Sequence, residues 1–209
     1  MGSCMKYKLF VLLGGDGVGK STTLSLINKA GWKIVSYSQE HVPSNYTAVN
    51  SIAKTVRDEA IPEFTTFSSE FRSAYYHLFV AYLQDVVEKA LSVSNVLCDS
   101  YYYKFLAKEQ VNKGDARVLS IWRTLRKPDK VIFLNLAPEV AYSRVIKIRK
   151  LQKNELALNS DSCKSNFVNF QTQLTRHILA ECTGIPIDFV STMQPAKKVA
   201  EQVMSKLVP

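Results

Sequence analysis

The segment Gly14-Gly15-Asp16-Gly17-Val18-Gly19-Lys20-Ser21 constrains the fold more than any other part of the chain. It has the spacing G-x-x-x-x-G-K-[ST], in which a glycine-rich turn ends in a lysine and a hydroxyl residue. The apolar run Leu9 to Leu13 predicts a buried strand before it, and residues 22–30 have helical periodicity after it. A strand, a glycine turn and a helix in this order bring backbone N–H groups to one point and predict an anion site. The alternative is a glycine turn with an incidental lysine.

The loop predicts a binding site for the phosphates of a nucleoside triphosphate. Lys20 is expected to place a mobile positive charge over the terminal phosphates, and the Ser21 hydroxyl is a candidate ligand for a magnesium ion. The expected cofactors are therefore ATP and Mg2+. The residues expected to hold the ATP phosphates are Gly14, Asp16, Gly17, Gly19, Lys20, Ser21 and Thr22.

The length and composition of the chain indicate one globular domain. With 209 residues, 46% of them hydrophobic, the chain is long enough to bury a core, and no linker divides it. No apolar run approaches the roughly 20 residues of a membrane span, and residues 1–13 lack the features of a secretory signal. The four cysteines form no C-x-x-C pair, which favours free thiols over disulfides or zinc ligation. We expect a single cytoplasmic domain over residues 1–209, without membrane contact.

The charge balance indicates anionic ligands. Lys and Arg number 27 against 18 Asp and Glu, which gives a formal net charge of +9. A basic protein suits polyanions such as nucleotides or nucleic acid. The chain has no zinc finger, no RNA-binding aromatic motif and no basic tail, so we expect nucleotide substrates and no specific nucleic-acid binding.

Strand and helix patterns alternate along the chain, which predicts an α/β fold with a five-stranded parallel sheet covered by helices on both faces. Strands are expected at residues 9–13, 33–38, 95–100, 131–136 and 187–190. Helices are expected at residues 22–30, 48–59, 64–91, 101–112, 115–125, from Pro138 onward, 167–182 and 196–207.

Three segments bear on a candidate site. Asp99 ends the third expected strand, and ligands of open α/β sheets bind beyond the carboxyl ends of the strands, so Asp99 is expected to face the glycine loop. Residues 64–91 carry aromatic side chains at three- and four-residue steps, which is typical of a helix buried in a core or a subunit interface. Residues 151–165 are polar, and we expect them to be mobile.

Several stretches resemble the thymidylate kinase family, within the nucleoside-monophosphate and deoxynucleoside kinase group. The loop has an acidic third residue, Asp16, as in that family. Residues 128–141 resemble the family's Pro-Asp, strand and Pro-Glu-x-Ala run, and residues 78–81 resemble the helix whose aromatic residue, here Phe79, stacks on the acceptor base. The similarity runs nearly end to end. It implies a P-loop kinase domain with a lid segment, which transfers a phosphoryl group from ATP to a nucleoside monophosphate.

The chain departs from the family at the acceptor side. Asp99-Ser100-Tyr101 stands where family members carry Asp-Arg-Tyr, so the arginine for the acceptor phosphate is replaced by serine. Leu83 stands where a second arginine is expected, and Ser38-Gln39-Glu40 replaces an Arg-Glu-Pro run. These changes leave open a different acceptor on the same scaffold.

Lys104 and Lys108 are candidate replacements for the missing arginine. They lie four residues apart, so on a helix they share a face just after Asp99 and are able to hold an anionic acceptor as two point charges. The alternative is a pair of solvent-exposed lysines balanced by Glu109. The resemblance also implies that Asp16 contacts the acceptor sugar; the alternative is that Asp16 only forms the turn.

The resemblance places a lid at approximately residues 144–165. In this family, glycine at the fourth loop position, here Gly17, accompanies catalytic arginines in the lid. Arg144 and Arg149 are therefore the candidates for stabilising the transferring phosphoryl group, with a basic exposed helix as the alternative.

These residues together predict a nucleoside-monophosphate kinase, most simply one that converts dTMP and ATP to dTDP and ADP. The candidate catalytic residues are Lys20, Asp99, Arg144 and Arg149; the acceptor-binding residues are Asp16, Phe79, Lys104 and Lys108; and the metal ligands are Ser21 and Asp99. We also expect a homodimer. The alternatives are a P-loop kinase for another nucleoside or small molecule, and a nucleotide-binding regulatory protein with low turnover.

Overall fold

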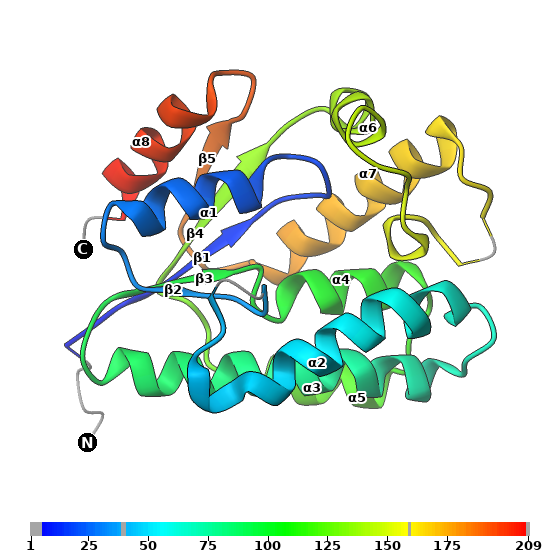
Figure 1. The fold of residues 1–209 in the computed structure, drawn as a ribbon, viewed down its shortest axis with the longest axis horizontal. Coiled ribbons are helices and arrows are strands. Elements are labelled where there is room, and N and C mark those ends of the chain that lie inside the picture. The colour runs from blue at the N-terminus through cyan, green and yellow to red at the C-terminus, as the bar shows by residue number, and fades with distance from the viewer. Residues whose placement is uncertain (1–5, 39–40, 159, 208–209) are drawn as a thin grey trace.

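A computed structural model describes residues 6–38, 41–158 and 160–207, and in these residues five parallel strands form one sheet (Figure 1). The strand order is β2-β3-β1-β4-β5, and every described pairing is parallel, which confirms the predicted α/β fold. The strands are β1 (Leu9–Leu13), β2 (Ile34–Val35), β3 (Val96–Asp99), β4 (Lys130–Asn135) and β5 (Ile187–Ser191).

Helices cover both faces of the sheet, as the burial of β1 on both sides requires. Phe10 and Leu12 belong to a core shared with α1 (Lys20–Lys29) and α8 (Ala196–Lys206), whereas Leu9, Val11 and Leu13 belong to a larger core on the opposite face. In Figure 1, α1 and α8 lie on one side of the sheet and α2 to α5 on the other. The remaining helices are α2 (Thr47–Thr55), α3 (Ser69–Leu91), α4 (Tyr103–Val111), α5 (Ala116–Arg123), α6 (Pro138–Ile146) and α7 (Lys164–Glu181).

Several element boundaries differ from the sequence-based prediction, and the largest shift is at the start of α3. Helix α3 begins five residues after Phe64, because the Ser68 side chain caps it by accepting a hydrogen bond from the backbone N–H of Phe71 at 3.2 Å. Strand β2 has two residues instead of six. Most of the aromatic stripe of α3 is buried in the larger core, although Phe71 is 52% exposed.

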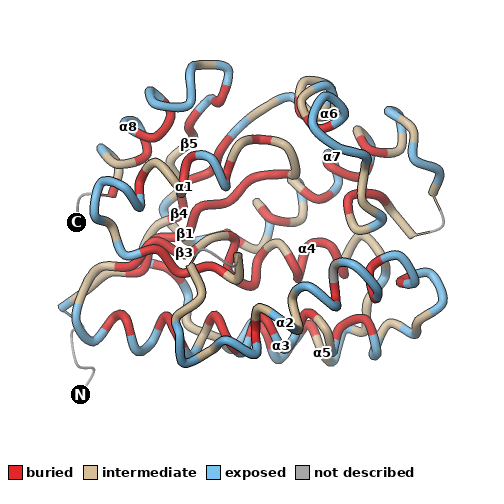
Figure 2. The backbone as a smooth tube through the Cα atoms, in the orientation of Figure 1, coloured by how far each residue is buried: buried red, intermediate tan, exposed pale blue. Residues whose placement is uncertain are grey.

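The segment expected to be a mobile lid is docked against the rest of the chain. Its short 3-10 helix, η5 (Lys153–Glu155), leads into Leu156, which is 1% exposed and packs with Val145 and Phe167 in a third, smaller core. Figure 2 colours most of this segment as exposed or intermediate, and buried positions lie in the neighbouring helix α7. Asn159, within the predicted lid, lies outside the described residues.

The order of the strands locates the site. Strand β1 lies at the centre, with β3 and β2 on one side and β4 and β5 on the other. The chain therefore leaves β1 toward one edge of the sheet and later crosses back to the other edge. A crevice is expected at such a switch point, beyond the carboxyl ends of the strands. None of the helices in the described ranges is both long and apolar enough to cross a membrane.

Candidate active site

A cavity of about 780 Å³ opens beyond the carboxyl ends of β1 and β3. The glycine loop, the end of β3, helix α4, the lid segment and the turn between β5 and α8 all contribute to its walls. Every candidate site residue from the sequence lines this cavity, with the exceptions of Gly14 and Phe79. The fold therefore brings together residues that are separated by more than a hundred positions.

Lys20 is buried rather than exposed at the loop end. Its side chain folds back so that Nζ donates to the carbonyl oxygens of Gly14 at 2.8 Å and Gly15 at 2.7 Å, and the residue is 9% exposed. Burial, followed by the repulsion of the Lys104 ammonium, lowers the pKa of Lys20 to about 7. The expectation of a mobile cation is thus corrected: the carbonyl groups of the loop itself hold Lys20.

The lowered pKa of Lys20 predicts proton uptake when a nucleotide binds. At pH 8 the free protein holds Lys20 mostly uncharged, and the phosphate anions of ADP would raise its pKa again and draw in up to about one proton. Nucleotide affinity should therefore weaken as the pH rises above 7. Calorimetry in buffers with different ionisation enthalpies measures the uptake, and Lys20→Met should abolish it. Equal proton uptake in that variant would assign the titration to another group.

Gly17 allows helix α6, which leads into the lid segment, to approach the loop closely. Its φ is +77°, and an added Cβ would lie 2.6 Å from Cγ2 of Val145 and 2.9 Å from the carbonyl oxygen of Ala141. A side chain at this position would therefore collide with the backbone of α6. Glycine at position 17 therefore lets α6 pack directly against the loop.

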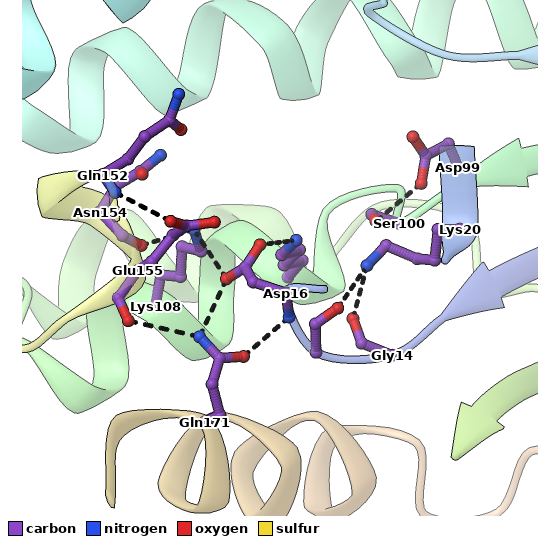
Figure 3. A network of polar contacts seen from close by, with 12 residues as sticks. Gly14, Asp16, Lys20, Asp99, Ser100, Lys108, Gln152, Asn154, Glu155 and Gln171 are labelled. Atoms are coloured by element: carbon purple, nitrogen blue, oxygen red, sulfur yellow. Dashed lines mark hydrogen bonds and ion pairs between the residues drawn. The ribbon is translucent and has the colours of Figure 1, made fainter. Parts of the chain in front are cut away.

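The Asp16 carboxylate forms ion pairs with two lysines of α4, of which Lys108 is labelled in Figure 3. Lys104 Nζ is 2.6 Å from Oδ1, and Lys108 Nζ is 3.4 Å from Oδ2. Although burial alone would raise the pKa of Asp16, the ammonium groups of Lys104, Lys108 and Lys20 hold it well below its usual value. Both oxygens of Asp16 are therefore bound within the protein.

Lys104 and Lys108 share a buried face of α4, which contradicts the alternative of two solvent-exposed lysines. Their side chains are 13% and 6% exposed, and Lys108 Nζ also donates to the carbonyl oxygen of Asn154 at 2.6 Å. Glu109, the proposed balancing group, points elsewhere: Ser73 donates to its carboxylate at 3.1 Å and Arg72 lies 3.8 Å from it.

Gln171 of α7 is a site residue that the sequence analysis missed. Its Oε1 accepts from the backbone N–H of Asp16 at 2.8 Å, and its Nε2 donates to Asp16 Oδ2 at 3.0 Å. The same Nε2 lies 3.4 Å from the carbonyl oxygen of Glu155 and joins the loop to the lid. A signal existed: Gln171 is a polar residue within the apolar stripe of its helix, and polar residues at such positions are seldom buried without a partner.

Replacement of Gln171 by leucine should destabilise the protein. The side chain is 2% exposed, so leucine would leave the backbone N–H of Asp16 buried without its partner, at a cost of about 1 to 3 kcal/mol. Urea unfolding measures the loss. Gln173→Leu, on the exposed face of the same helix, is the matched control and should change little. Equal stability of the two variants would show that the bridge contributes nothing.

Asp99 lies at the end of β3, on the cavity wall. Ser36 donates to its Oδ2 at 3.2 Å and Ser100 to its Oδ1 at 2.9 Å. Ser100 and Tyr101 have φ values of 58° and 45°, in the left-handed region that non-glycine residues seldom adopt. Ser100, where the family resemblance implies an arginine, is 3% exposed, and its hydroxyl donates to Asp99.

The oxygen groups of the cavity fit a magnesium ion held mainly by phosphates. Ser21 offers a hydroxyl and Asp99 a carboxylate, and both line the same cavity. The described residues contain no group of three or more His, Cys, Asp or Glu suited to a metal. Mg2+ commonly binds through one or two carboxylates together with substrate phosphates, so Ser21 and Asp99 suit this ion.

The two lid arginines have different partners. Arg149 donates to both carboxylate oxygens of Glu155, with Nη1 at 2.8 Å from Oε2, and Glu155 is 2% exposed. Arg144 donates through Nη2 to the carbonyl oxygen of Thr192 at 2.7 Å, in the turn after β5. Nothing in the polar segment around Glu155 marked it as buried, so sequence reasoning missed it.

A second cavity of about 490 Å³ adjoins the first. Tyr37, Gln152 and Asn154 line both cavities, and Phe79 and Phe105 belong to the aromatic wall of the second. The ring of Tyr37 lies 5.4 Å from Phe79 and 5.5 Å from Phe105, between centroids. Phe79 is 3% exposed, so it is a core residue that also forms the wall of a cavity.

Comparisons with known proteins agree with this fold and identify its family. The family model for thymidylate kinase matches residues 13–178. A thymidylate kinase from Lactobacillus helveticus is 23% identical over 208 residues, which cover 93% of this chain and 92% of that protein. A structure of deoxyadenosine kinase from M. mycoides with the products dCMP and a flexible dCDP has a TM-score of 0.65 at 16% identity, covering 95% of this chain and 98% of that one. The same kinase with bound dATP has a TM-score of 0.61 at 17% identity, covering 96% and 99%.

Proposed function

Because the chain belongs to the thymidylate kinase family, we propose that it transfers the terminal phosphoryl group of ATP to a nucleoside monophosphate, with dTMP as the first acceptor to test. Family membership supports a nucleotide kinase, and the thymidylate kinase of Lactobacillus helveticus supports a monophosphate acceptor. The products would be a nucleoside diphosphate and ADP.

The observation that most supports this function is the charge of the first cavity. Six basic side chains and three carboxylates line it, and two of the ammonium groups, those of Lys104 and Lys108, form ion pairs with the single carboxylate of Asp16. Catalysis of phosphoryl transfer depends mainly on positioning and on neutralising anionic oxygens. An excess of cations over carboxylates along one cavity suits two phosphorylated substrates that meet there.

Each part of the reaction has candidate residues. Lys20 and the loop amides would hold the terminal phosphates of ATP, and Arg149 would stabilise the transferring group. Lys104 and Lys108 would face the acceptor phosphate in place of the missing arginine. Mg2+, held by Ser21 and Asp99, would neutralise charge on the ATP phosphates. Since both Asp16 oxygens are already bound, we assign Asp16 to the positioning of the two lysines.

A second candidate is a nucleoside acceptor with a free 5′-hydroxyl. Ser100 favours it, because this buried serine stands where the family resemblance implies the arginine for the acceptor phosphate. One fold neighbour is named a deoxyadenosine kinase, an enzyme whose acceptor is a nucleoside, and its structure holds the products dCMP and a flexible dCDP. For that acceptor, Asp99 would receive the hydroxyl proton.

A coupled assay of ADP formation separates these functions. ATP and Mg2+ are supplied with dTMP, dAMP, dCMP or dGMP, and in parallel with the four corresponding nucleosides. Turnover with a monophosphate supports the proposal, and turnover with nucleosides alone supports the second candidate. ADP formation that no acceptor stimulates would overturn both and favour a nucleotide-binding regulatory protein.

Replacement of Phe79 tests the aromatic wall. Phe79→Ala would cost about 3 to 5 kcal/mol of stability in a core position, so Phe79→Leu is the informative change. If the ring stacks on a planar base, the acceptor KM should rise roughly five- to a hundred-fold while the ATP KM is unchanged. Steady-state kinetics measure both constants. A stable leucine variant with unchanged acceptor KM would leave Phe79 as a core residue only.

A further inference from the structure

The structure assigns recognition of the acceptor nucleoside to two carboxamides, Asn50 of α2 and Asn154 of η5, which stand outside the motifs of the family resemblance. This assignment rests on the proposed function and specifies which groups of the acceptor are contacted. Asn50 would accept a hydrogen bond from an N–H on the edge of the base. Asn154 would accept one from a hydroxyl of the sugar.

Both carboxamides have an unpaired buried oxygen. Asn50 Oδ1 and Asn154 Oδ1 are buried and have no hydrogen-bond partner within the described part of the chain. Buried polar atoms in folded proteins are nearly always paired, and each exception requires an explanation. Both residues line the second cavity, so a ligand there is able to supply the missing donors.

The order of residues along the two cavities orients the acceptor. Asn154 lines both cavities. Its backbone carbonyl oxygen accepts a hydrogen bond from Lys108, and Lys108 also forms an ion pair with Asp16 of the glycine loop. Asn50 lines only the second cavity, with Phe79 and Phe105. An acceptor whose phosphate lies near the loop therefore has its sugar beside Asn154 and its base among the aromatic rings, with an edge toward Asn50.

The chemistry of these walls differs from recognition by arginine. Leu83, where an arginine is expected from the resemblance, is fully buried in the core and contributes no polar group. A carboxamide oxygen accepts one N–H, and its loss leaves a buried acceptor unpaired. Discrimination between acceptor bases should therefore depend on whether the base offers an N–H to Asn50, as well as on its stacking against the aromatic rings.

The test compares matched ligands on the protein and two variants. Binding of dTMP is measured by calorimetry against its N3-methyl analogue and its 3′-deoxy analogue, and binding of dAMP against the analogue without the 6-amino group. The variants Asn50→Leu and Asn154→Leu replace each carboxamide by a side chain of similar size. Asn45→Leu, at an exposed position that lines neither cavity, is the control. Thermal unfolding checks that each variant is folded.

The unmodified protein should bind each monophosphate roughly five- to a hundred-fold more tightly than the analogue without the donor. Asn50→Leu should abolish the preference for the base N–H and retain the preference for the 3′-hydroxyl, and Asn154→Leu should do the reverse. Unchanged ratios in both variants would overturn the assignment. If monophosphates bind in these ratios but no ADP forms, the proposed function fails and the assignment stands. If no monophosphate binds, both fail.

Discussion

Replacement of Lys20 with alanine is expected to abolish ATP-dependent phosphoryl transfer while the fold remains intact. Lys20 is the cation of the glycine loop, and removal of a group that stabilises charge in the transition state typically costs on the order of 10²- to 10³-fold in rate or more. Its burial with a pKa lowered to about 7 means that the folded state gains little from its charge. The free energy of unfolding should therefore change little, while the rate of ADP formation falls by orders of magnitude.

Matched variants separate the charge from the side chain. Lys20→Met keeps the apolar stem and should be as inactive as Lys20→Ala. Lys29→Ala, at an exposed position in the last turn of α1, should retain full activity. The rate of ADP formation and urea unfolding are measured for all three variants. If Lys20→Met turns over at a rate close to that of the unmodified protein, the assignment of the glycine loop to ATP-phosphate binding is wrong.

The parts of the fold that were predictable are those in which local sequence determines local structure. The strand, glycine loop and helix at residues 9–30 follow from an apolar run, a turn that only glycine permits and helical periodicity. The same holds for β4 and the start of α6, where Pro138 occupies the first turn of the helix. In each case the signal lies within about ten residues.

The contacts that build the site were not predictable in this way. Lys104 meets Asp16 across 88 positions and Gln171 meets it across 155, and both contacts depend on how α4 and α7 pack beside the loop. Sequence spacing showed that Lys104 and Lys108 share a helix face, but not that this face is buried against a carboxylate. The docking of Glu155 likewise depends on tertiary packing, because its own segment is polar.

The lid arginines supply the second large expected effect. Arg149→Ala should lower kcat by on the order of 10³-fold with little change in the KM for ATP, as for other arginines that neutralise the transferring phosphoryl group. Arg149→Lys should restore little, because lysine has no planar fork to engage the Glu155 carboxylate and a phosphate together. Steady-state kinetics over ATP and acceptor concentrations separate the two constants.

Glu155 and Arg144 determine how such a result is interpreted. Glu155→Gln keeps the size of the buried side chain but removes its charge, so the Arg149 guanidinium should be held less firmly and kcat should fall by an intermediate factor. Arg144 is bound to the turn after β5, so Arg144→Ala tests whether a guanidinium on that wall contributes to the rate as well. If kcat falls in Arg149→Ala but not in Arg144→Ala, stabilisation of the transferring phosphoryl group is assigned to Arg149. Near-normal rates in both alanine variants would instead show that the basic residues of the lid do not take part in catalysis. That result would favour a nucleotide-binding regulatory protein over an enzyme.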